Sequence, residues 1–174
     1  IEFMKDCQNK VKKILAICWG MQVAVTAAGG QVKKANNSHI GIANEIEINQ
    51  HGLIHPLYEN KDKKFNSPAF NFDEVVKLPE NGICLASNKI NKIQSLYFET
   101  NNTCVWGLQY HPEITYEKMI SLIQFRKDKL IENRKVFKDE NDVEEHISFI
   151  KQETLKDNKE KRMMELKNWL NQLN

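Results

Sequence analysis

Apolar residues follow a different pattern in each part of the chain. Residues 13–18 carry the nearly continuous apolar run Ile-Leu-Ala-Ile-Cys, which is typical of a strand buried on both faces. Residues 2–12 are charged with spaced apolar positions and predict a surface helix. Residues 19–28 predict a second helix, ended by Gly29 and Gly30, whose alanine-rich face would pack closely on a sheet.

The middle of the chain, residues 31–110, changes to short strand-like pieces separated by turn residues. Asn101 and Asn102 lie between two of these pieces and predict a hairpin turn. The predicted strands cover residues 31–34, 42–48, 69–72, 83–87, 93–98 and 104–110.

The C-terminal part, from Tyr116, has apolar residues at helical spacing and predicts a helix, followed by two more over residues 141–156 and 159–173. Its many charges and sparse apolar positions fit a helical cap on the domain, and a partner-binding appendage is the alternative. The whole chain therefore predicts an α/β fold: a mainly parallel sheet flanked by helices, with a β-rich insertion and a helical C-terminal cap.

The composition fits one soluble globular domain. The chain has 174 residues, 41% hydrophobic and 28% charged, with a net charge of +2, so no strong field points to nucleic acid or to a membrane. No apolar run reaches the about 18 residues of a membrane span, and the first residues lack the apolar core of a signal peptide. No pair of cysteines has CxxC spacing, which favours free thiols and a cytoplasmic location.

Cys18 ends the first apolar run, with Ala16 two residues before it and Gly20 two residues after it. This is the layout of a nucleophile elbow, a sharp strand-to-helix turn at which bulky flanking side chains would clash. A helix that starts directly after the cysteine aims its free N–H groups at the sulfur, which favours the thiolate and can stabilise an oxyanion. An inert buried cysteine is the alternative.

His111 follows a second apolar strand and precedes Pro112, which prevents the strand from continuing. Glu113 is two residues further on, and residues i and i+2 of an extended segment point the same way. Glu113 can therefore orient the imidazole while the other ring nitrogen faces the thiol, so Cys18, His111 and Glu113 form a candidate triad. Glu113 can also simply favour the start of the following helix.

No other cluster in the sequence predicts a metal or cofactor site. His51 and His55 are four residues apart, but Gly52 and Pro56 argue against a helix there, and no HExxH or CxxC motif accompanies them. Neither GxGxxG nor GxxxxGK[ST] is present. We therefore expect no metal and no cofactor.

Two motifs together resemble the class I glutamine amidotransferases: Ala-Ile-Cys-Trp-Gly-Met-Gln at residues 16–22 and Gly-Leu-Gln-Tyr-His-Pro-Glu at residues 107–113. Within this family the chain looks closest to the stand-alone GMP synthase-like members. Residues 72–79 resemble their H-x-D-x-V-x-x-L-P stretch, and residues 165–170 are similar to their C-terminal helix. The resemblance implies a flavodoxin-like class I glutaminase fold.

The resemblance also implies a reaction. The Cys18 thiolate would attack the side-chain amide of L-glutamine, His111 would protonate the departing ammonia and then activate water, and Glu113 would orient His111. The backbone N–H of Trp19 would be one oxyanion donor. The products would be glutamate and ammonia, the ammonia being supplied to an unidentified acceptor such as a synthetase or another ammonia-accepting subunit.

The family pattern implies further site residues and a division of the chain. Gln22, Asn71 and Phe72 would help to hold glutamine. Residues 1–125 would be the amidotransferase domain, and residues 126–174 a helical C-terminal extension. The domain is expected to be incomplete at its N-terminus, because the first strands of the family and a Gly-rich loop that donates the second oxyanion N–H do not appear in the sequence.

Two other functions fit the same residues. One is a γ-glutamyl hydrolase or a cysteine-peptidase-like hydrolase built on the same scaffold. The other is a non-catalytic regulatory module that retains the triad, for which Cys18 would be no more reactive than Cys84 or Cys104.

Overall fold

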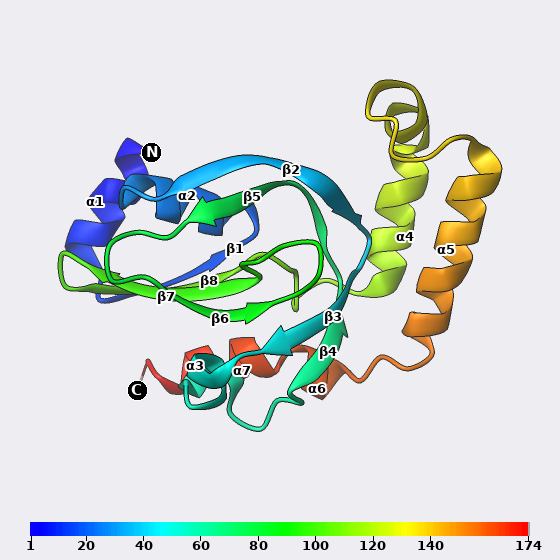
Figure 1. Cartoon of the computed structure of the whole chain (residues 1–174). Coiled ribbons are helices and arrows are strands. Elements are labelled where there is room, and N and C mark those ends of the chain that lie inside the picture. The colour runs from blue at the N-terminus through cyan, green and yellow to red at the C-terminus, as the bar shows by residue number, and fades with distance from the viewer. Residues whose placement is uncertain (174) are drawn as a thin grey trace.

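A curled six-stranded sheet forms the centre of the computed structural model, which describes residues 1–173 (Figure 1). The strand order is β1-β8-β7-β6-β3-β4, and a separate ribbon pairs β2 with β5. The strands are β1 (Lys13–Ile17), β2 (Gln31–Ile40), β3 (Ala43–Ile48), β4 (Lys64–Ser67), β5 (Phe70–Lys77), β6 (Ile83–Ser87), β7 (Ser95–Thr100) and β8 (Thr103–Leu108).

The helices flank the sheet on several sides (Figure 1). They are α1 (Glu2–Lys10), α2 (Trp19–Ala27), α3 (Gln50–Leu53), the 3₁₀ turn η1 (Pro56–Tyr58), α4 (Tyr116–Phe125), the π-helical turn η2 (Lys129–Asn133), α5 (Glu140–Thr154), α6 (Lys159–Arg162) and α7 (Met164–Asn171). The predicted α/β fold is therefore confirmed.

The strand directions differ from the expected predominance of parallel pairs. Among the described strands only β1 and β8 pair in parallel, and the other ladders of the sheet are antiparallel. A short connection explains the direction of one ladder, because β7 and β8 are joined by the two-residue turn Asn101–Asn102, whereas parallel strands need a long crossover. Both asparagines have positive φ, which confirms the predicted hairpin.

Several boundaries follow the prediction and others do not. Helix α2 ends before Gly29, whose φ of +84° confirms the predicted glycine stop. Strands β2 and β5 are longer than predicted, because His39 pairs with Asn71 and Lys34 with Asp73 across polar stretches of low strand propensity. Strand β4 was not predicted, since it has a single large apolar residue.

A one-turn helix also forms where none was expected. Helix α3 includes His51 and Gly52, and its N-cap, Asn49, accepts a hydrogen bond from the Gly52 N–H at 3.0 Å. The glycine fits because its hydrogen faces the β6 backbone, where a Cβ atom would lie 2.3 Å from the Leu85 carbonyl oxygen. His55 lies outside the helix, with its ring against Tyr97.

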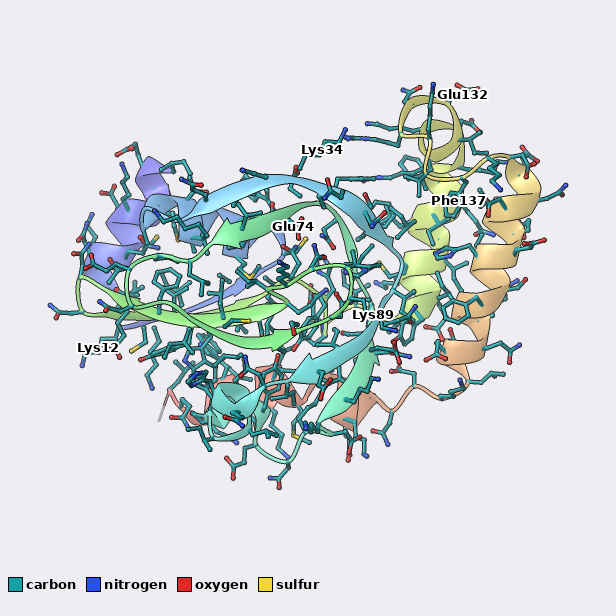
Figure 2. All side chains as sticks on the ribbon, viewed as in Figure 1. Lys12, Lys34, Glu74, Lys89, Glu132 and Phe137 are labelled. Atoms are coloured by element: carbon teal, nitrogen blue, oxygen red, sulfur yellow. The ribbon has the colours of Figure 1, made fainter. Side chains whose placement is uncertain are left out.

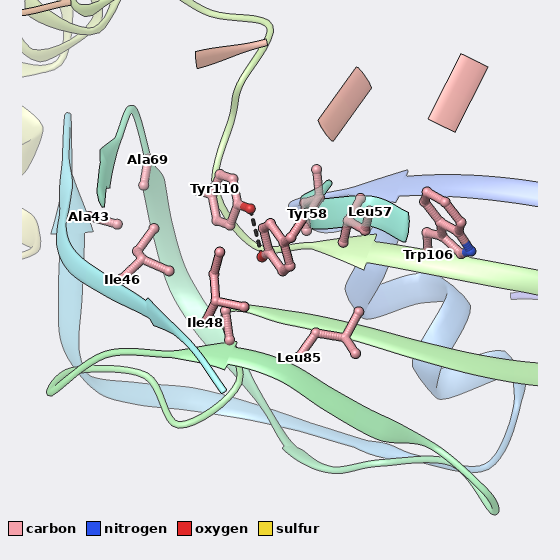
Figure 3. Close-up of a cluster of buried hydrophobic side chains, with 11 residues drawn as sticks. Ala43, Ile46, Ile48, Leu57, Tyr58, Ala69, Leu85, Trp106 and Tyr110 are labelled. Carbon is pink, nitrogen blue, oxygen red and sulfur yellow. Dashed lines mark hydrogen bonds between the residues drawn. The ribbon is translucent and has the colours of Figure 1, made fainter. Parts of the chain in front are cut away.

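Apolar clusters cover both faces of the sheet at its central strands, β7 and β8. Trp106 of β8 faces one apolar cluster, which also contains the Tyr58 and Tyr110 rings shown in Figure 3. Val105 of β8 and Leu96 of β7 face a second cluster beneath α2. Gly107 lets α2 approach this second face closely, because a Cβ atom there would lie 2.7 Å from side-chain atoms of Met21 and Leu96.

The predicted C-terminal cap is divided between two places (Figure 1). Helix α5 packs beside α4, and Figure 2 shows Phe137 between the two helices. Helices α6 and α7 lie near α3 and η1 on another side, where Trp169 packs on the cluster of Figure 3. The predicted boundary at residue 125 stays a prediction, and residue 174 lies outside the described residues. No helix among residues 1–173 has the length and apolarity needed to cross a bilayer.

We expect Gly107→Ala to destabilise the fold, because the added methyl group has no room between α2 and β7. Overpacking of this kind costs about 1–3 kcal/mol, which lowers the melting temperature of a domain of this size by several degrees. Thermal unfolding followed by circular dichroism measures the change. Gly20→Ala is the matched control, since no atom lies within 4 Å of its added Cβ. Equal melting temperatures for the two variants would contradict this account of the packing.

Candidate active site

Cys18 lies in the sharp turn between β1 and α2, as predicted for a nucleophile elbow. Its φ of 52° and ψ of −111° are unfavourable for a residue with a side chain. The Cys18 N–H donates to the Leu108 carbonyl oxygen at 2.6 Å, which ties the elbow to the end of β8. The turn is thus held by the parallel pair of strands that leads into it.

The residues flanking the elbow behave differently from one another. Ala16 is buried, with 3% of its surface exposed, which fits the expected need for a small side chain. Gly20 has open space where a Cβ atom would be, so the predicted clash with a bulky side chain is not seen at this position. Trp19 begins α2 and its side chain is 74% exposed. Its N–H, at the first helical position, has no partner within the helix.

His111 and Glu113 meet beside the elbow. The His111 Nδ1 and Glu113 Oε1 atoms are 2.6 Å apart. The contact forms across a turn, in which the Ile114 N–H donates to the His111 carbonyl oxygen at 3.2 Å, and not along the extended segment that was expected. Pro112 stands at the second position of this turn, which suits its fixed φ.

The environment of His111 favours its protonated form. Burial alone would lower the pKa of His111, but hydrogen bonds and charge interactions with Cys18 and Glu113 outweigh burial and raise the pKa to about 9. The three predicted triad residues therefore interact through His111, which contacts Glu113 and is influenced by Cys18.

Gln109 also contacts the thiol, although it was not among the predicted site residues. Its Nε2 atom lies 3.6 Å from Cys18 Sγ, and its Oε1 atom accepts a hydrogen bond from Gln22 Nε2 at 3.1 Å. Gln109 is fully buried, so the contact with Gln22 fixes which end of its amide faces the sulfur. The position between an apolar strand and the histidine was the signal that could have identified it.

Gln22 and Asn71 converge on one backbone carbonyl. Both side chains are more than nine-tenths buried, and the Gln22 Nε2 and Asn71 Nδ2 atoms each lie 3.0 Å from the Asp73 oxygen of β5. Gln22 therefore holds the β5 backbone next to α2, and Asn71 fixes the local course of β5 from within the strand. The Phe70 carbonyl oxygen of the same strand lies 3.8 Å from Cys18 Sγ.

The ring of Phe72 faces the helical part of the molecule. It packs edge-on against Phe70, with ring centroids 5.7 Å apart, and lies beneath the Arg134 guanidinium. Both rings pack against the apolar cluster of α4 and α5. A role of Phe72 at the thiol would therefore have to come from its backbone.

With this geometry established, comparison with known proteins gives the family. The model of the family described as glutamine amidotransferase class-I matches residues 1–127. The chain belongs to the class I glutamine amidotransferase family. This membership agrees with the order of the cysteine and the histidine-glutamate pair along the chain.

Two curated relatives illustrate the range within the family. One, named gamma-glutamyl-L-1-hydroxyisopropylamide hydrolase, from Pseudomonas sp., is 33% identical over 119 residues, or 66% of this chain. The other, a subunit of the glutamine-hydrolyzing GMP synthase from Methanocaldococcus jannaschii, is 30% identical over 120 residues, or 67% of this chain. The matched segments span 40% and 61% of these relatives.

Solved structures agree on the fold. A glutamine amidotransferase from Thermotoga maritima superposes with a TM-score of 0.69 at 17% identity, covering 98% of this chain and 66% of that one. A glutamine amido transferase from Methylobacillus flagellatus gives a TM-score of 0.62 at 12% identity, covering 96% and 67%. These similarities confirm the expected class I amidotransferase fold.

Glu113→Gln should reduce stability at low pH and leave it nearly unchanged at high pH. A raised pKa means that the folded protein holds the His111 proton more tightly than the unfolded chain does, and this proton binding stabilises the fold. The gain in folding stability is complete below pH 6.5 and is lost as the pH rises through about 9. Removing the Glu113 charge reduces this gain. Urea unfolding from pH 6 to pH 10 tests it, with the exposed Glu145→Gln as control. A stability difference that does not change with pH would contradict the assignment.

Gln109→Leu should slow alkylation of Cys18 by iodoacetamide. A hydrogen bond to a charged group contributes about 1.5–3 kcal/mol, so loss of the donor should lower the rate at neutral pH by roughly tenfold or more. Cys84 provides an internal reference in the same sample, because burial raises the pKa of its thiol and keeps it unreactive. An unchanged Cys18 rate in a folded variant would rule out this role for Gln109.

Proposed function

We propose that this chain hydrolyses the side-chain amide of L-glutamine to glutamate and ammonia through a thioester on Cys18. The observation that carries the proposal is a cysteine in a strained elbow beside an imidazole whose other nitrogen is 2.6 Å from a carboxylate. A nucleophile, a general acid-base group and an orienting group are the parts that acyl transfer needs. Membership of the amidotransferase family supports the same reaction.

The reaction follows from the proton positions. The Cys18 thiolate attacks the amide carbon, and the C–N bond breaks as the His111 imidazolium gives its proton to the leaving nitrogen. Ammonia departs and a γ-glutamyl thioester remains. His111 then takes a proton from water as the hydroxide attacks the thioester, and the C–S bond breaks. The Cys18 thiolate and the His111 imidazolium are thereby restored, and the product leaves as glutamate after its new carboxyl group loses its proton to solvent. Glu113 keeps the imidazole in the required orientation throughout.

Four residues are proposed to bind the substrate or its oxyanion, or to shape the glutamine site. The Trp19 N–H, at the start of α2, is the proposed donor to the oxyanion. Gln22 and Asn71 shape the glutamine site indirectly, by fixing the β5 backbone at Asp73. Phe72 contributes through its backbone on the same strand. These roles make β5 one wall of the site.

The fate of the ammonia is proposed from the relatives. The relative from Methanocaldococcus jannaschii is named as one subunit of GMP synthase, which supports a synthetase as the partner that accepts the ammonia. In this proposal residues 1–125 carry the amidotransferase domain, residues 126–174 form a helical extension, and the protein acts in the cytoplasm without a cofactor.

A γ-glutamyl hydrolase is the second candidate, because the Pseudomonas relative is named as a hydrolase of a γ-glutamyl amide. The chemistry at Cys18 is the same for both substrates. Only the leaving group differs, since an amine with a carbon substituent replaces ammonia. The room on the leaving-group side of the thiol therefore decides between them.

The deciding experiment measures glutamate release from L-glutamine and from a γ-glutamyl alkylamide by the purified chain. We expect release from glutamine, and its loss by more than about 10³-fold in Cys18→Ala, since the covalent step then has no nucleophile. Faster turnover of the alkylamide would favour the γ-glutamyl hydrolase. Lys127→Ala, which removes an exposed ion pair with Glu140, is the control and should retain activity.

Absence of turnover with both substrates, combined with a Cys18 alkylation rate equal to that of Cys84, would overturn the proposal. The chain would then be a non-catalytic module that retains the triad. A rapidly alkylated Cys18 without turnover would also count against hydrolysis by this chain alone, and it would locate the failure in substrate binding or in the oxyanion site.

A further inference from the structure

Residues 110, 112 and 114 of the segment that carries His111 and Glu113 are bound to the C-terminal tail, defined here as residues 157–171. The Tyr110 hydroxyl group donates to Glu165 Oε1 at 2.7 Å. The carbonyl oxygens of residues 112 and 114 both accept from Arg162. The tail is thus in direct contact with the residues on either side of each member of the imidazole-carboxylate pair.

Arg162 makes the closest of these contacts. Its Nη1 atom donates to the Pro112 carbonyl oxygen at 2.6 Å and to the Ile114 carbonyl oxygen at 3.1 Å. Its Nε atom donates to Asp157 Oδ1 at 3.0 Å, so the carboxylate fixes the plane of the guanidinium. Arg162 is only 8% exposed, which makes these bonds its main polar environment.

A second buried contact holds the tail to the body of the protein. Glu165 is fully buried and pairs with Lys61 at 2.9 Å, and the side chain of Lys61 is only 5% exposed. Asn168 Nδ2 donates to the Leu57 and Glu59 carbonyl oxygens at 3.0 and 2.9 Å. The tail is therefore held to the protein by hydrogen bonds that do not involve the turn. These bonds fix the position of the helix that directly follows Arg162.

We infer that Arg162 is a positioning residue for the proposed hydrolysis: by holding the Pro112 and Ile114 carbonyl groups, it keeps the side chains of His111 and Glu113 in position beside Cys18. This inference rests on the proposed function and assigns a task to the helical tail. Arg162 touches neither the thiol nor the imidazole, so it acts only through the turn.

The alternative is that Arg162 only fastens the tail, and the geometry argues against it. Any buried hydrogen-bond acceptor would be enough to attach the tail. The Arg162 guanidinium instead donates to the two carbonyl groups on either side of Glu113. Loss of the guanidinium leaves a buried oxygen at Pro112 and a part-buried one at Ile114 without this donor, so the turn would relax to find other partners. A small displacement is enough to weaken a 2.6 Å contact between His111 and Glu113.

The test follows the His111 imidazole by NMR with histidine labelled at Cε1, across pH 5 to pH 10. The chain has five histidines, and the His111 signal is the one missing from His111→Gln. Burial lowers the pKa of His39 and of His55 to about 4, so their signals should stay constant in this range. The experiment needs neither substrate nor turnover.

In the unaltered protein we expect His111 to titrate near pH 9. In Arg162→Gln the midpoint should fall toward 6.5 by about one unit or more, a tenfold change in proton affinity. Arg162→Lys should lie between the two, because an ammonium group can bond one carbonyl but cannot reproduce the fork. Lys161→Ala, next in sequence and in an exposed ion pair with Asp62, should titrate like the unaltered protein.

Asp157→Asn keeps the test decisive if Arg162→Gln does not fold, since it weakens the hold on the guanidinium and leaves Arg162 in place. A smaller fall in the His111 midpoint is expected. Folded variants at both positions that titrate like the unaltered protein would overturn the inference.

A His111 that titrates at 6.5 in the unaltered protein would overturn both the inference and the proposed site. A shifted His111 that falls in Arg162→Gln, in a chain that releases no glutamate, would support the positioning role and would count against the proposed function alone.

Discussion

The parallel pairing of β1 with β8 is the interaction on which the rest of the site depends. Its register places Ile17 opposite Leu108, and the Cys18 N–H continues the ladder by donating to the Leu108 carbonyl oxygen. Cys18 and the segment that carries His111 thus leave the sheet at the same edge. A slip of one residue would move a strand by about 3.3 Å and turn its side chains to the other face, which would separate the two groups.

Packing on both sides of the sheet opposes such a slip. Trp106 belongs to one apolar cluster and Val105 to the other, so each face fixes the register of β8 independently. Met21 of α2 rests against Gly107, which sets the depth at which the elbow can be placed. The unfavourable φ of Cys18 persists because these surrounding contacts determine the backbone more strongly than local preference does.

Local patterns were sufficient to predict the parts of the site that lie close together in sequence. The apolar run before Cys18 and the strand before His111 were visible in the sequence, and so was the hairpin at Asn101. The two motifs also identified the family. Pairings between polar stretches were not visible, because His39 and Asn71 have low strand propensity and meet only through tertiary structure.

Contacts made by single buried polar groups could not be predicted from the sequence either. Gln109 and Arg162 look like ordinary polar residues of a strand end and a charged helix, and their importance emerges only when their partners are placed. The role of a residue in such a network is set by geometry that no periodicity encodes.

The docking of the tail has a consequence for the order of events in folding. β1 pairs with a strand about ninety residues later, and the turn after that strand is bound by residues that are synthesised later still. Contacts of such long sequence separation form late, because the entropy of closing the intervening chain must be overcome first. A nascent chain therefore carries Cys18 without an imidazole beside it at least until β8 and His111 have been synthesised, and the thiol meets its polar neighbours only after this long-range pairing has formed.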